Sequence, residues 1–502
     1  MSVSVGRLML SFDLRRRAGT FPKYWSRCFG SEHAGYFLRK DLLDHFRVGR
    51  ATFHNEYVRF HGILSEPVGV VRGVRDGHID YAWFNLERIY DNILDLGMRP
   101  IVEYSFMPAA LASGSESIFY WEGNVTMPKR IGDWAELIEA VTRRVYRRYG
   151  KAEVRRWYFE VWNEPNLPKW FFKGSMRDYF ALYDHAAEAV KRVDPLLRVG
   201  GPATACAEWV RETIEHCRHE NVARPGRGHT PLDFVSYHLY PSDPFFMESE
   251  GMPLGWKGEA FFRESIRRNH EIVRSYRDMD LEIHMTEWNC SSNSRDPIHD
   301  APGGAAFAVK AIQEVAGRVD TFSWWTLSDL FEEGGLPPAP FHGGFGLMTV
   351  DGLRKPTWFA FEALQDLGED LLAKPVSTAD HAAGCIPTRG YDGSARLLFW
   401  AFHFPKSPKP PVRRVKVALA GFPSGKTRAS VTHYRIDGTH SNIRPAWERL
   451  GSPDSLSPAQ VDALAAQNTF QTLEIKDIPV RHGRATVAFD LPPDAVSYLV
   501  VR

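Results

Sequence analysis

The stretch WYFEVWNEPN, residues 157–166, places a short apolar run directly before a polar segment that contains Glu164. Its aromatic and β-branched residues are typical of a buried strand, and Pro165 stops strand pairing because proline has no backbone N–H to donate. A second stretch, LEIHMTEWN at residues 281–289, has the same form and ends its apolar run at Glu287. We therefore expect each glutamate at the carboxyl end of a strand.

Short apolar runs of this kind alternate with amphipathic stretches through about the first 365 residues. Residues 133–149 and 176–193 show the periodicity of helices with one apolar face. The expected strands begin near Tyr24, Tyr57, Pro100, Trp157, Arg198, Asp233, Leu281 and Thr321. Eight strands with helical crossovers predict an α/β fold with a closed (β/α)8 TIM barrel rather than an open doubly wound sheet.

After Leu364 the pattern changes to strands broken by proline and glycine. The runs lie at residues 395–402, 414–419, 428–434, 472–478 and 485–501. We interpret them as an accessory β-sandwich, completed by an N-terminal strand at residues 2–12. The predicted organisation is a catalytic barrel at residues 15–365 and an accessory β-sandwich domain made of residues 1–14 and 366–502.

Composition restricts the class of partner. Lysine and arginine total 62 against 61 aspartate and glutamate, so no strong field attracts nucleic acid or an anionic membrane. The five cysteines are odd in number and form no CxxC pair, which argues against a disulfide framework or structural zinc. No apolar run is long enough to span a bilayer. We expect a cytoplasmic protein that acts on a small molecule, with its oligomeric state left open.

Glu164 and Glu287 end the fourth and seventh expected strands, so their side chains can face each other across the mouth of a barrel. Glycosidic cleavage needs such a pair, held at roughly 5 to 5.5 Å in a retaining enzyme. Either glutamate alone would be read as an ordinary ion-paired charge at a strand end. His284 and Glu287 have an HxxE spacing, which on a strand does not place both side chains on one face. We therefore expect no metal, and hydrolysis by a pair of carboxylates needs no cofactor.

WNEPN and TEWN resemble the acid/base and nucleophile motifs of clan A glycoside hydrolases. Further motifs resemble glycoside hydrolase family 39, which contains β-xylosidases and α-L-iduronidases, and the resemblance extends over nearly the whole chain. These motifs are VRFHGIL at residues 58–64, SYHLYP at 236–241, WWTLSDLFEE at 324–333, FHGGFGLMTVDGLRKP at 341–356 and YRIDGTHSN at 434–442.

The resemblance implies roles for single residues. Glu164 matches the general acid/base and Glu287 the nucleophile. Asn163, directly before the acid/base, resembles the asparagine that binds the sugar 2-hydroxyl. His61 and Gly62, at the end of the second strand, match a contact to a sugar hydroxyl.

His238 and Tyr240 resemble groups that position the sugar and orient the nucleophile. Trp325 matches an aromatic platform, and because Trp324 is its neighbour on a strand only one of the two can face the sugar. Glu332 and Glu333 match acidic contacts to distal hydroxyls, with a solvated charge pair as the alternative.

The resemblance implies a retaining, exo-acting glycosidase, with β-D-xylosides as the expected substrates and xylose released from xylo-oligosaccharides. A related enzyme acting on another pentoside or a uronide, and a non-catalytic carbohydrate-binding protein, are the alternatives. We expect the pocket to be closed by residues of the loops after the third, fourth and eighth strands. These are Tyr120, Trp121, Trp170, Phe171, Phe172, Glu332 and Glu333.

Overall fold

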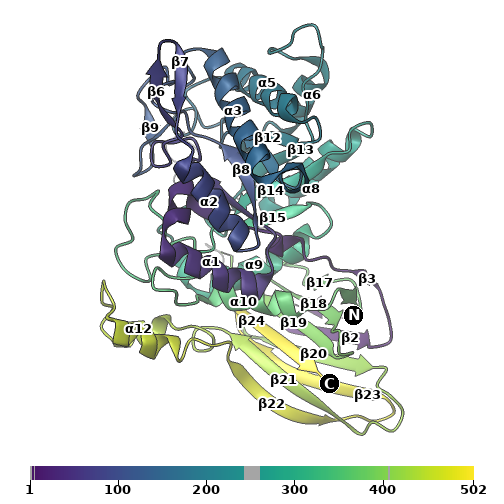
Figure 1. Ribbon diagram of the computed structural model, residues 1–502. Coiled ribbons are helices and arrows are strands. Elements are labelled where there is room, and N and C mark those ends of the chain that lie inside the picture. The colour runs from purple at the N-terminus through teal and green to yellow at the C-terminus, as the bar shows by residue number, and fades with distance from the viewer. Residues whose placement is uncertain (1–2, 5, 242–259, 405–407) are drawn as a thin grey trace.

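The computed structural model describes residues 3–4, 6–241, 260–404 and 408–502. Figure 1 shows a barrel ringed by helices stacked on a β-sandwich, with both ends of the chain in the sandwich. Among the helices in these ranges, none is long and apolar enough to cross a bilayer.

Eight parallel strands close into a barrel, as predicted. In chain order they are β4 (Cys28–His33), β5 (Tyr57–His61), β8 (Arg99–Tyr104), β11 (Tyr158–Val161), β12 (Arg198–Thr204), β13 (Phe234–Leu239), β14 (Glu282–Trp288) and β15 (Thr321–Trp324). The first strand begins at Cys28 rather than near Tyr24, because Tyr24–Ser26 forms a 3-10 turn. The barrel order makes β11 the fourth strand and β14 the seventh.

Helices cover the outside of the barrel. They are α1 (Lys40–Phe53), α2 (Phe84–Asp95), α3 (Ile131–Tyr149), α4 (Lys151–Val154), α5 (Met176–Val193), α6 (Val210–His219), α8 (Phe261–Ser275), α9 (Pro302–Val315) and α10 (Pro356–Asp366). The two helices predicted from periodicity correspond to α3 and α5. Helix α5 begins at its expected residue because Ser175 and Asp178 form a capping box that satisfies two backbone N–H groups.

The loops between the barrel strands and helices contain short strands and 3-10 turns. The strands are β6 (Val71–Arg75), β7 (His78–Tyr81), β9 (Ser117–Ile118) and β10 (Gly123–Asn124), and the 3-10 turns include Ala34–Leu38, Ala205–Ala207 and Pro297–Asp300. β6 pairs with β7 and β9 with β10, so the loops after β5 and β8 each carry a small hairpin.

The sandwich consists of two sheets. One has the order β1 (Val3–Ser4), β2 (Arg7–Asp13), β20 (Arg413–Ala420) and β23 (Arg484–Leu491). The other has the order β22 (Thr472–Pro479), β21 (Arg428–Ile436), β24 (Ala495–Val501), β19 (Ala395–Ala401), β18 (Ala383–Arg389), β16 (Asp370–Leu371) and β3 (Gly19–Thr20), with β17 (Val376–Ser377) paired to β18. The expected run at 485–501 is two strands, since Pro492 and Pro493 interrupt it.

Strand β19 is buried on both faces because it separates two cores. Leu397 and Phe399 face the interior of the sandwich, while Leu398 and Trp400 join the core of the barrel helices. Trp400 Nε1 also donates to Gln313 Oε1 of α9 at 2.8 Å. The sandwich is thus fastened to the barrel by apolar packing and by a buried hydrogen bond.

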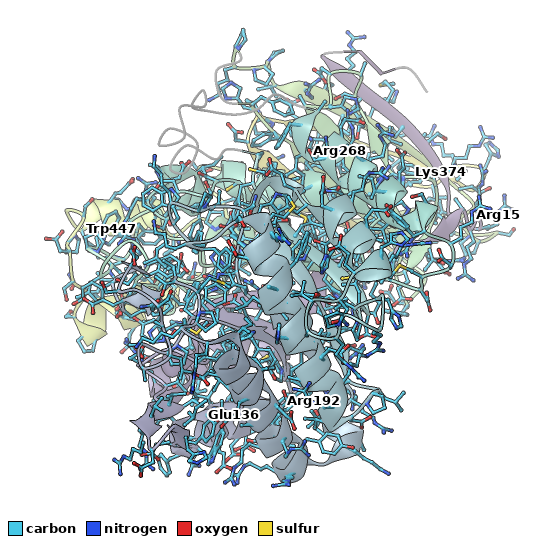
Figure 2. The ribbon with its side chains drawn as sticks, turned by 90° about the horizontal axis from the view of Figure 1, so that it is seen from above. Arg15, Glu136, Arg192, Arg268, Lys374 and Trp447 are labelled. Atoms are coloured by element: carbon cyan, nitrogen blue, oxygen red, sulfur yellow. The ribbon has the colours of Figure 1, made fainter. Side chains whose placement is uncertain are left out.

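An arm of residues 437–471 leaves the sandwich between β21 and β22 and contains α11 (Arg444–Arg449) and α12 (Pro458–Ala465). Figure 2 places Trp447 of this arm on the opposite side of the molecule from Lys374. The Trp447 ring lies 5.2 Å from that of Phe341, in the loop after β15. Asn468 exchanges hydrogen bonds with the backbone of Arg354. The strand pattern of the tail did not predict this arm.

Candidate active site

A cavity of about 320 Å³ lies at the carboxyl ends of the barrel strands, which is where barrel enzymes place their active sites. Seven of the ten predicted site residues line it: His61, Asn163, Glu164, Tyr240, Glu287, Trp325 and Glu333. A wider groove of about 790 Å³ beside α6 and α8 contains none of them. The structure therefore brings most of the predicted residues to one place.

The other three predicted residues lie behind or beside the lining. His238 is fully buried beneath Glu164. Gly62 has a φ of 69°, and a Cβ there would come within 3.1 Å of the Trp121 ring, so the position requires glycine. Glu332 lies 3.9 Å from Arg39. None of these three is part of the cavity wall formed by the described residues.

Glu164 follows β11 on a turn that holds its side chain over the barrel mouth. Trp162 and Glu164 both have a positive φ, 71° and 44°, which for residues other than glycine costs about 1–3 kcal/mol each. The Glu164 N–H donates to the Ala203 carbonyl at 2.9 Å, and the Trp162 indole donates to the Phe171 carbonyl at 2.8 Å. These bonds hold the strained turn in place.

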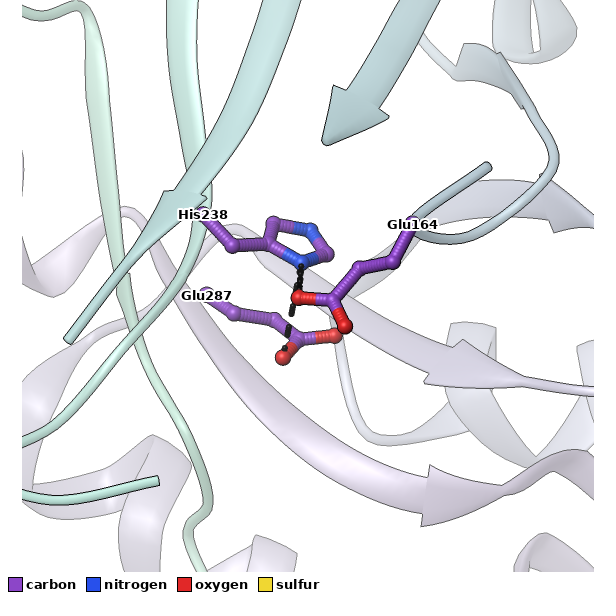
Figure 3. Close-up of side chains that lie close together, drawn as sticks. All are labelled: Glu164, His238 and Glu287. Atoms are coloured by element: carbon purple, nitrogen blue, oxygen red, sulfur yellow. Dashed lines mark hydrogen bonds and ion pairs between the residues drawn. The ribbon is translucent and has the colours of Figure 1, made fainter. Parts of the chain in front are cut away.

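Glu164 and Glu287 face each other, as Figure 3 shows. One oxygen of each carboxylate and one ring nitrogen of His238 all lie within 4.8 Å of one another. Both glutamates are 5% exposed, so they are almost entirely withdrawn from water yet still reach the cavity. This 4.8 Å upper bound is short enough for the paired-carboxylate arrangement of retaining glycosidases, whose carboxyl groups lie roughly 5 to 5.5 Å apart.

Arg59 lies under the site and was not predicted. Its guanidinium is fully buried and donates to Glu287 Oε1 at 2.6 Å and to Asn163 Oδ1 at 2.9 Å. It also forms ion pairs with Glu103 at 2.7 Å and Glu160 at 2.6 Å. One cation therefore compensates the charge of several buried carboxylates. Burying any of these carboxylates without a cation would cost stability.

Glu287 has two donors that favour its charged form. Besides Arg59, the Tyr240 hydroxyl donates to Glu287 Oε2 at 2.9 Å. Burial raises the pKa of Glu287, and the positive charges of Arg59 and His61 oppose that rise. The net result is a pKa of about 7, and in its ionised form a carboxylate held by two donors is suited to nucleophilic attack.

His61 is held between two carboxylates. Its Nδ1 lies 2.7 Å from Glu103 and its Nε2 lies 3.2 Å from Glu333. Burial lowers the pKa of His61, but Glu103 and Glu333 outweigh it and raise the pKa well above the ordinary value. The cavity floor therefore presents a cationic donor next to Glu287.

Aromatic rings form the cavity walls. Trp325 and Phe119 lie against His61, with centroids 4.7 Å and 5.7 Å from its ring. Trp170, Phe171 and Phe345 complete the aromatic lining. Trp324 is buried among core residues instead, as expected for the neighbour of a residue that faces the cavity. The aromatic surface suits the apolar face of a sugar ring.

Some aromatic residues predicted to close the pocket lie elsewhere. Tyr120 is 61% exposed, and Phe172 is fully buried in the core. Trp121 is not part of the described lining; its ring lies 5.4 Å from that of Phe119, and its indole donates to Glu32 Oε1 at 2.8 Å. Burial, together with the charge of Glu333, raises the pKa of Glu32 to about 8. Sequence proximity to the strand ends did not show which side chains turn inward.

Several lining residues had no signal in the sequence. Residues 292–295, in the loop after β14, include Asn293 and Arg295 in the cavity wall. Arg59 had a usable signal, because it lies two residues before His61 on one strand and alternation directs both into the barrel. The loop residues lacked such a register.

The donor atoms of Glu164, His238 and Glu287 are close enough together to suit a metal ion. Each, however, is engaged within the protein: Glu287 accepts from Arg59 and Tyr240, and His238 pairs with Glu164. His284, of the HxxE spacing, lies 3.2 Å from Glu282 instead. The donor set thus fits the chemistry of two carboxylates better than that of a metal centre.

Comparison with known proteins agrees with this geometry. Residues 9–474 match the sequence profile of glycosyl hydrolases family 39. The chain belongs to this family. A β-xylosidase of Caldicellulosiruptor saccharolyticus is 36% identical over 500 residues, which cover 99% of this chain and 98% of that protein. A β-xylosidase of Geobacillus stearothermophilus is 35% identical over 88% of this chain and 86% of its own length.

Solved structures support the same family 39 assignment. The crystal structure of a monomeric β-xylosidase from Caulobacter crescentus superposes with a TM-score of 0.84 at 33% identity, covering 99% of each chain. This family 39 chain is therefore a glycosidase with a TIM barrel and an attached β-sandwich.

Proposed function

We propose that the protein is an exo-acting β-D-xylosidase that releases xylose from xylo-oligosaccharides with retention of configuration. The observation that carries the proposal is the meeting of Glu164 and Glu287 within 4.8 Å at one small cavity. The two curated relatives described above are β-xylosidases, which supports xylose as the sugar.

In the first step, Glu287 attacks the anomeric carbon while Glu164 gives its proton to the glycosidic oxygen. The bond between that carbon and the leaving oxygen breaks, and an ester bond to Glu287 forms. Arg59 and Tyr240 hold the Glu287 carboxylate by its two oxygens, so it is oriented before the sugar arrives.

In the second step, Glu164, now ionised, takes a proton from a water molecule that attacks the anomeric carbon. The ester bond breaks, xylose leaves with its original configuration, and Glu287 returns to a carboxylate. Glu164 regains its proton in the same step. No group outside the chain is consumed except water.

We assign the sugar contacts from the cavity wall. His61, Asn163 and Glu333 can bind hydroxyls, and Trp325 provides an aromatic platform. His238 and Tyr240 orient the two carboxylates, through bonds of 2.9 Å each.

Gly62 and Glu332, predicted as sugar contacts, take supporting roles in this proposal. Gly62 admits the close approach of the Trp121 ring. Glu332 holds the loop after β15 against Arg39. The loop carries the neighbouring Glu333 into the cavity wall.

An uncharged pentose fits the wall better than a uronide. Arg295 is a cation in the lining, but its Nη2 donates to the carbonyls of Gly334, Gly335 and Leu336 at 2.8–3.3 Å. These bonds direct the guanidinium to the loop after β15 rather than to a carboxylate of a substrate. Action on a uronide is the alternative hypothesis for the substrate.

We also propose the predicted division into a catalytic barrel at residues 15–365 and a supporting sandwich of 1–14 and 366–502, corrected at its N-terminal boundary because β3 (Gly19–Thr20) pairs with β16 of the sandwich. A cytoplasmic location is part of the same proposal. It is supported by four buried cysteine thiols, Cys28, Cys217, Cys290 and Cys385, which suit a reducing compartment.

A panel of p-nitrophenyl glycosides tests the function. We expect the β-D-xyloside to have the highest kcat/KM, with the α-L-arabinoside weaker and the α-L-iduronide inert. Preference for the iduronide would contradict the proposal. Xylose binding by calorimetry without hydrolysis of any member would favour the non-catalytic alternative.

A further inference from the structure

His238 continues a chain of buried side chains behind Glu164. Its Nδ1 lies 2.9 Å from Glu164 Oε1, and its Nε2 lies 3.1 Å from the Thr286 hydroxyl oxygen. The Thr286 hydroxyl in turn donates to Glu160 Oε1 at 3.0 Å. His238, Thr286 and Glu160 are all fully buried, so water does not compete for these bonds.

The direction of each hydrogen bond follows from the far end of this chain. Arg59 Nε donates to Glu160 Oε2 at 2.6 Å, which makes Glu160 a charged acceptor. The single Thr286 proton points to Glu160, so the Thr286 oxygen has only lone pairs to offer His238. The proton of neutral His238 therefore belongs on Nε2, which leaves Nδ1 as an acceptor towards Glu164.

The surroundings keep His238 neutral. Burial, together with the charges of Arg59 and His61, places the pKa of His238 well below its ordinary value. The groups that face its ring are Glu164 on one side, Thr286 on the other, and Glu287, whose Oε2 lies 3.6 Å from Nδ1. The nearby carboxylates are the groups that would otherwise favour a charged ring, and the two cations oppose them.

We propose that Thr286 and Glu160 are positioning residues that fix the proton of His238 on Nε2, and that this tautomer keeps Glu164 ready as the proton donor. A lone pair on Nδ1 accepts from the protonated Glu164 carboxyl and stabilises it. The opposite tautomer would donate to ionised Glu164 and stabilise the form that cannot protonate a leaving group. After Glu164 has given up its proton, the same lone pair disfavours the bare carboxylate and makes it a better base for the second step.

The fold brings Thr286 into this position through an irregularity in β14. The pairing of β14 with β15 shifts register between Met285 and Trp288. In a regular strand, consecutive residues point to opposite faces. Here Thr286 contacts His238 while Glu287 contacts Arg59 and Tyr240, so both consecutive side chains serve the same site.

The test compares two aryl β-D-xylosides on Thr286→Val, which keeps the shape of the side chain and removes its hydroxyl. This test rests on the proposed function, because its substrates are xylosides. A phenyl leaving group needs protonation by Glu164, whereas a 2,4-dinitrophenyl group leaves without it. We expect kcat/KM for the phenyl substrate to fall about tenfold or more, with the dinitrophenyl value nearly unchanged. Thr286→Ser should restore the ratio of the two.

Each ratio is measured on one preparation, so it does not depend on the fraction of folded protein, and Thr286→Ala provides a second variant if valine is not accommodated. An unchanged ratio, or an equal fall for both substrates, would overturn the inference. A wild-type enzyme inactive on both xylosides would instead contradict the proposed function. The same ratio would then be measured on the phenyl and dinitrophenyl forms of the glycoside that the panel identifies.

Discussion

Arg59 lies 2.6 Å from Glu287, with its Nη1 donating to the Glu287 Oε1 that faces it. The same guanidinium reaches Asn163, the residue before Glu164, at 2.9 Å. A single side chain of β5 thus links the ends of β11 and β14. This contact holds the Glu287 carboxylate and the turn that carries Glu164 to the same buried side chain.

Arg59→Met should destabilise the protein and abolish activity. It leaves Glu103 and Glu160 buried without their cation, which typically costs about 3–5 kcal/mol of unfolding free energy. Urea unfolding measures the change. Arg148→Met is the matched control, because Arg148 pairs with Asp91 at the surface, where a pair contributes roughly 1 kcal/mol or less. Equal losses in the two variants would contradict this account of Arg59.

Glu164→Gln should separate substrates by their leaving groups. Loss of general acid catalysis typically costs on the order of 10²- to 10⁴-fold in rate. The hydrolysis of phenyl xyloside should show this full loss. Dinitrophenyl xyloside should still form the ester, and added azide should then yield β-xylosyl azide. Glu136→Gln serves as the control, since Glu136 is an exposed residue of α3 and lies outside the described cavity lining. A uniform loss without azide rescue would contradict the acid/base role.

Activity should fail on the acid side as Glu287 becomes protonated. Because burial raises the pKa of Glu287, kcat/KM should fall as pH decreases through a midpoint above the ordinary glutamate pKa of about 4.3. Tyr240→Phe removes a donor to the carboxylate and should move that midpoint to higher pH. A hydrogen bond to a charged group is worth about 1.5–3 kcal/mol, so kcat/KM should also fall roughly 10- to 100-fold. A midpoint that stays in place in Tyr240→Phe would count against this role.

Trp447→Ala should loosen the helical arm from the loop after β15. Truncation of a buried tryptophan costs about 3–5 kcal/mol, and we expect a lower Tm together with a raised KM because Glu333 lies on that loop. Tyr391→Ala is the control, since Tyr391 is 83% exposed. A Trp447 variant with wild-type KM would show that the arm does not support the site.

Much of this architecture could be predicted from the amino-acid sequence. Periodicity predicted the barrel and two helices, and the strand ends located Glu164 and Glu287. Other parts depend on geometry that has no local signal. Arg295 enters the wall through the course of a loop, and Thr286 turns inward because of a register shift. Tyr120 and Phe119 are neighbours, yet only Phe119 lines the cavity, because loop backbone decides which ring turns inward.

The most direct test of the central claim is to trap the sugar on its nucleophile. Incubation with dinitrophenyl 2-deoxy-2-fluoro-β-D-xyloside should inactivate the enzyme, because fluorine slows the second step more than the activated first step. Digestion and mass spectrometry should then find the fluoroxylosyl group on Glu287. The group on another residue, or turnover of this reagent with an inverted product and no covalent adduct, would contradict the account.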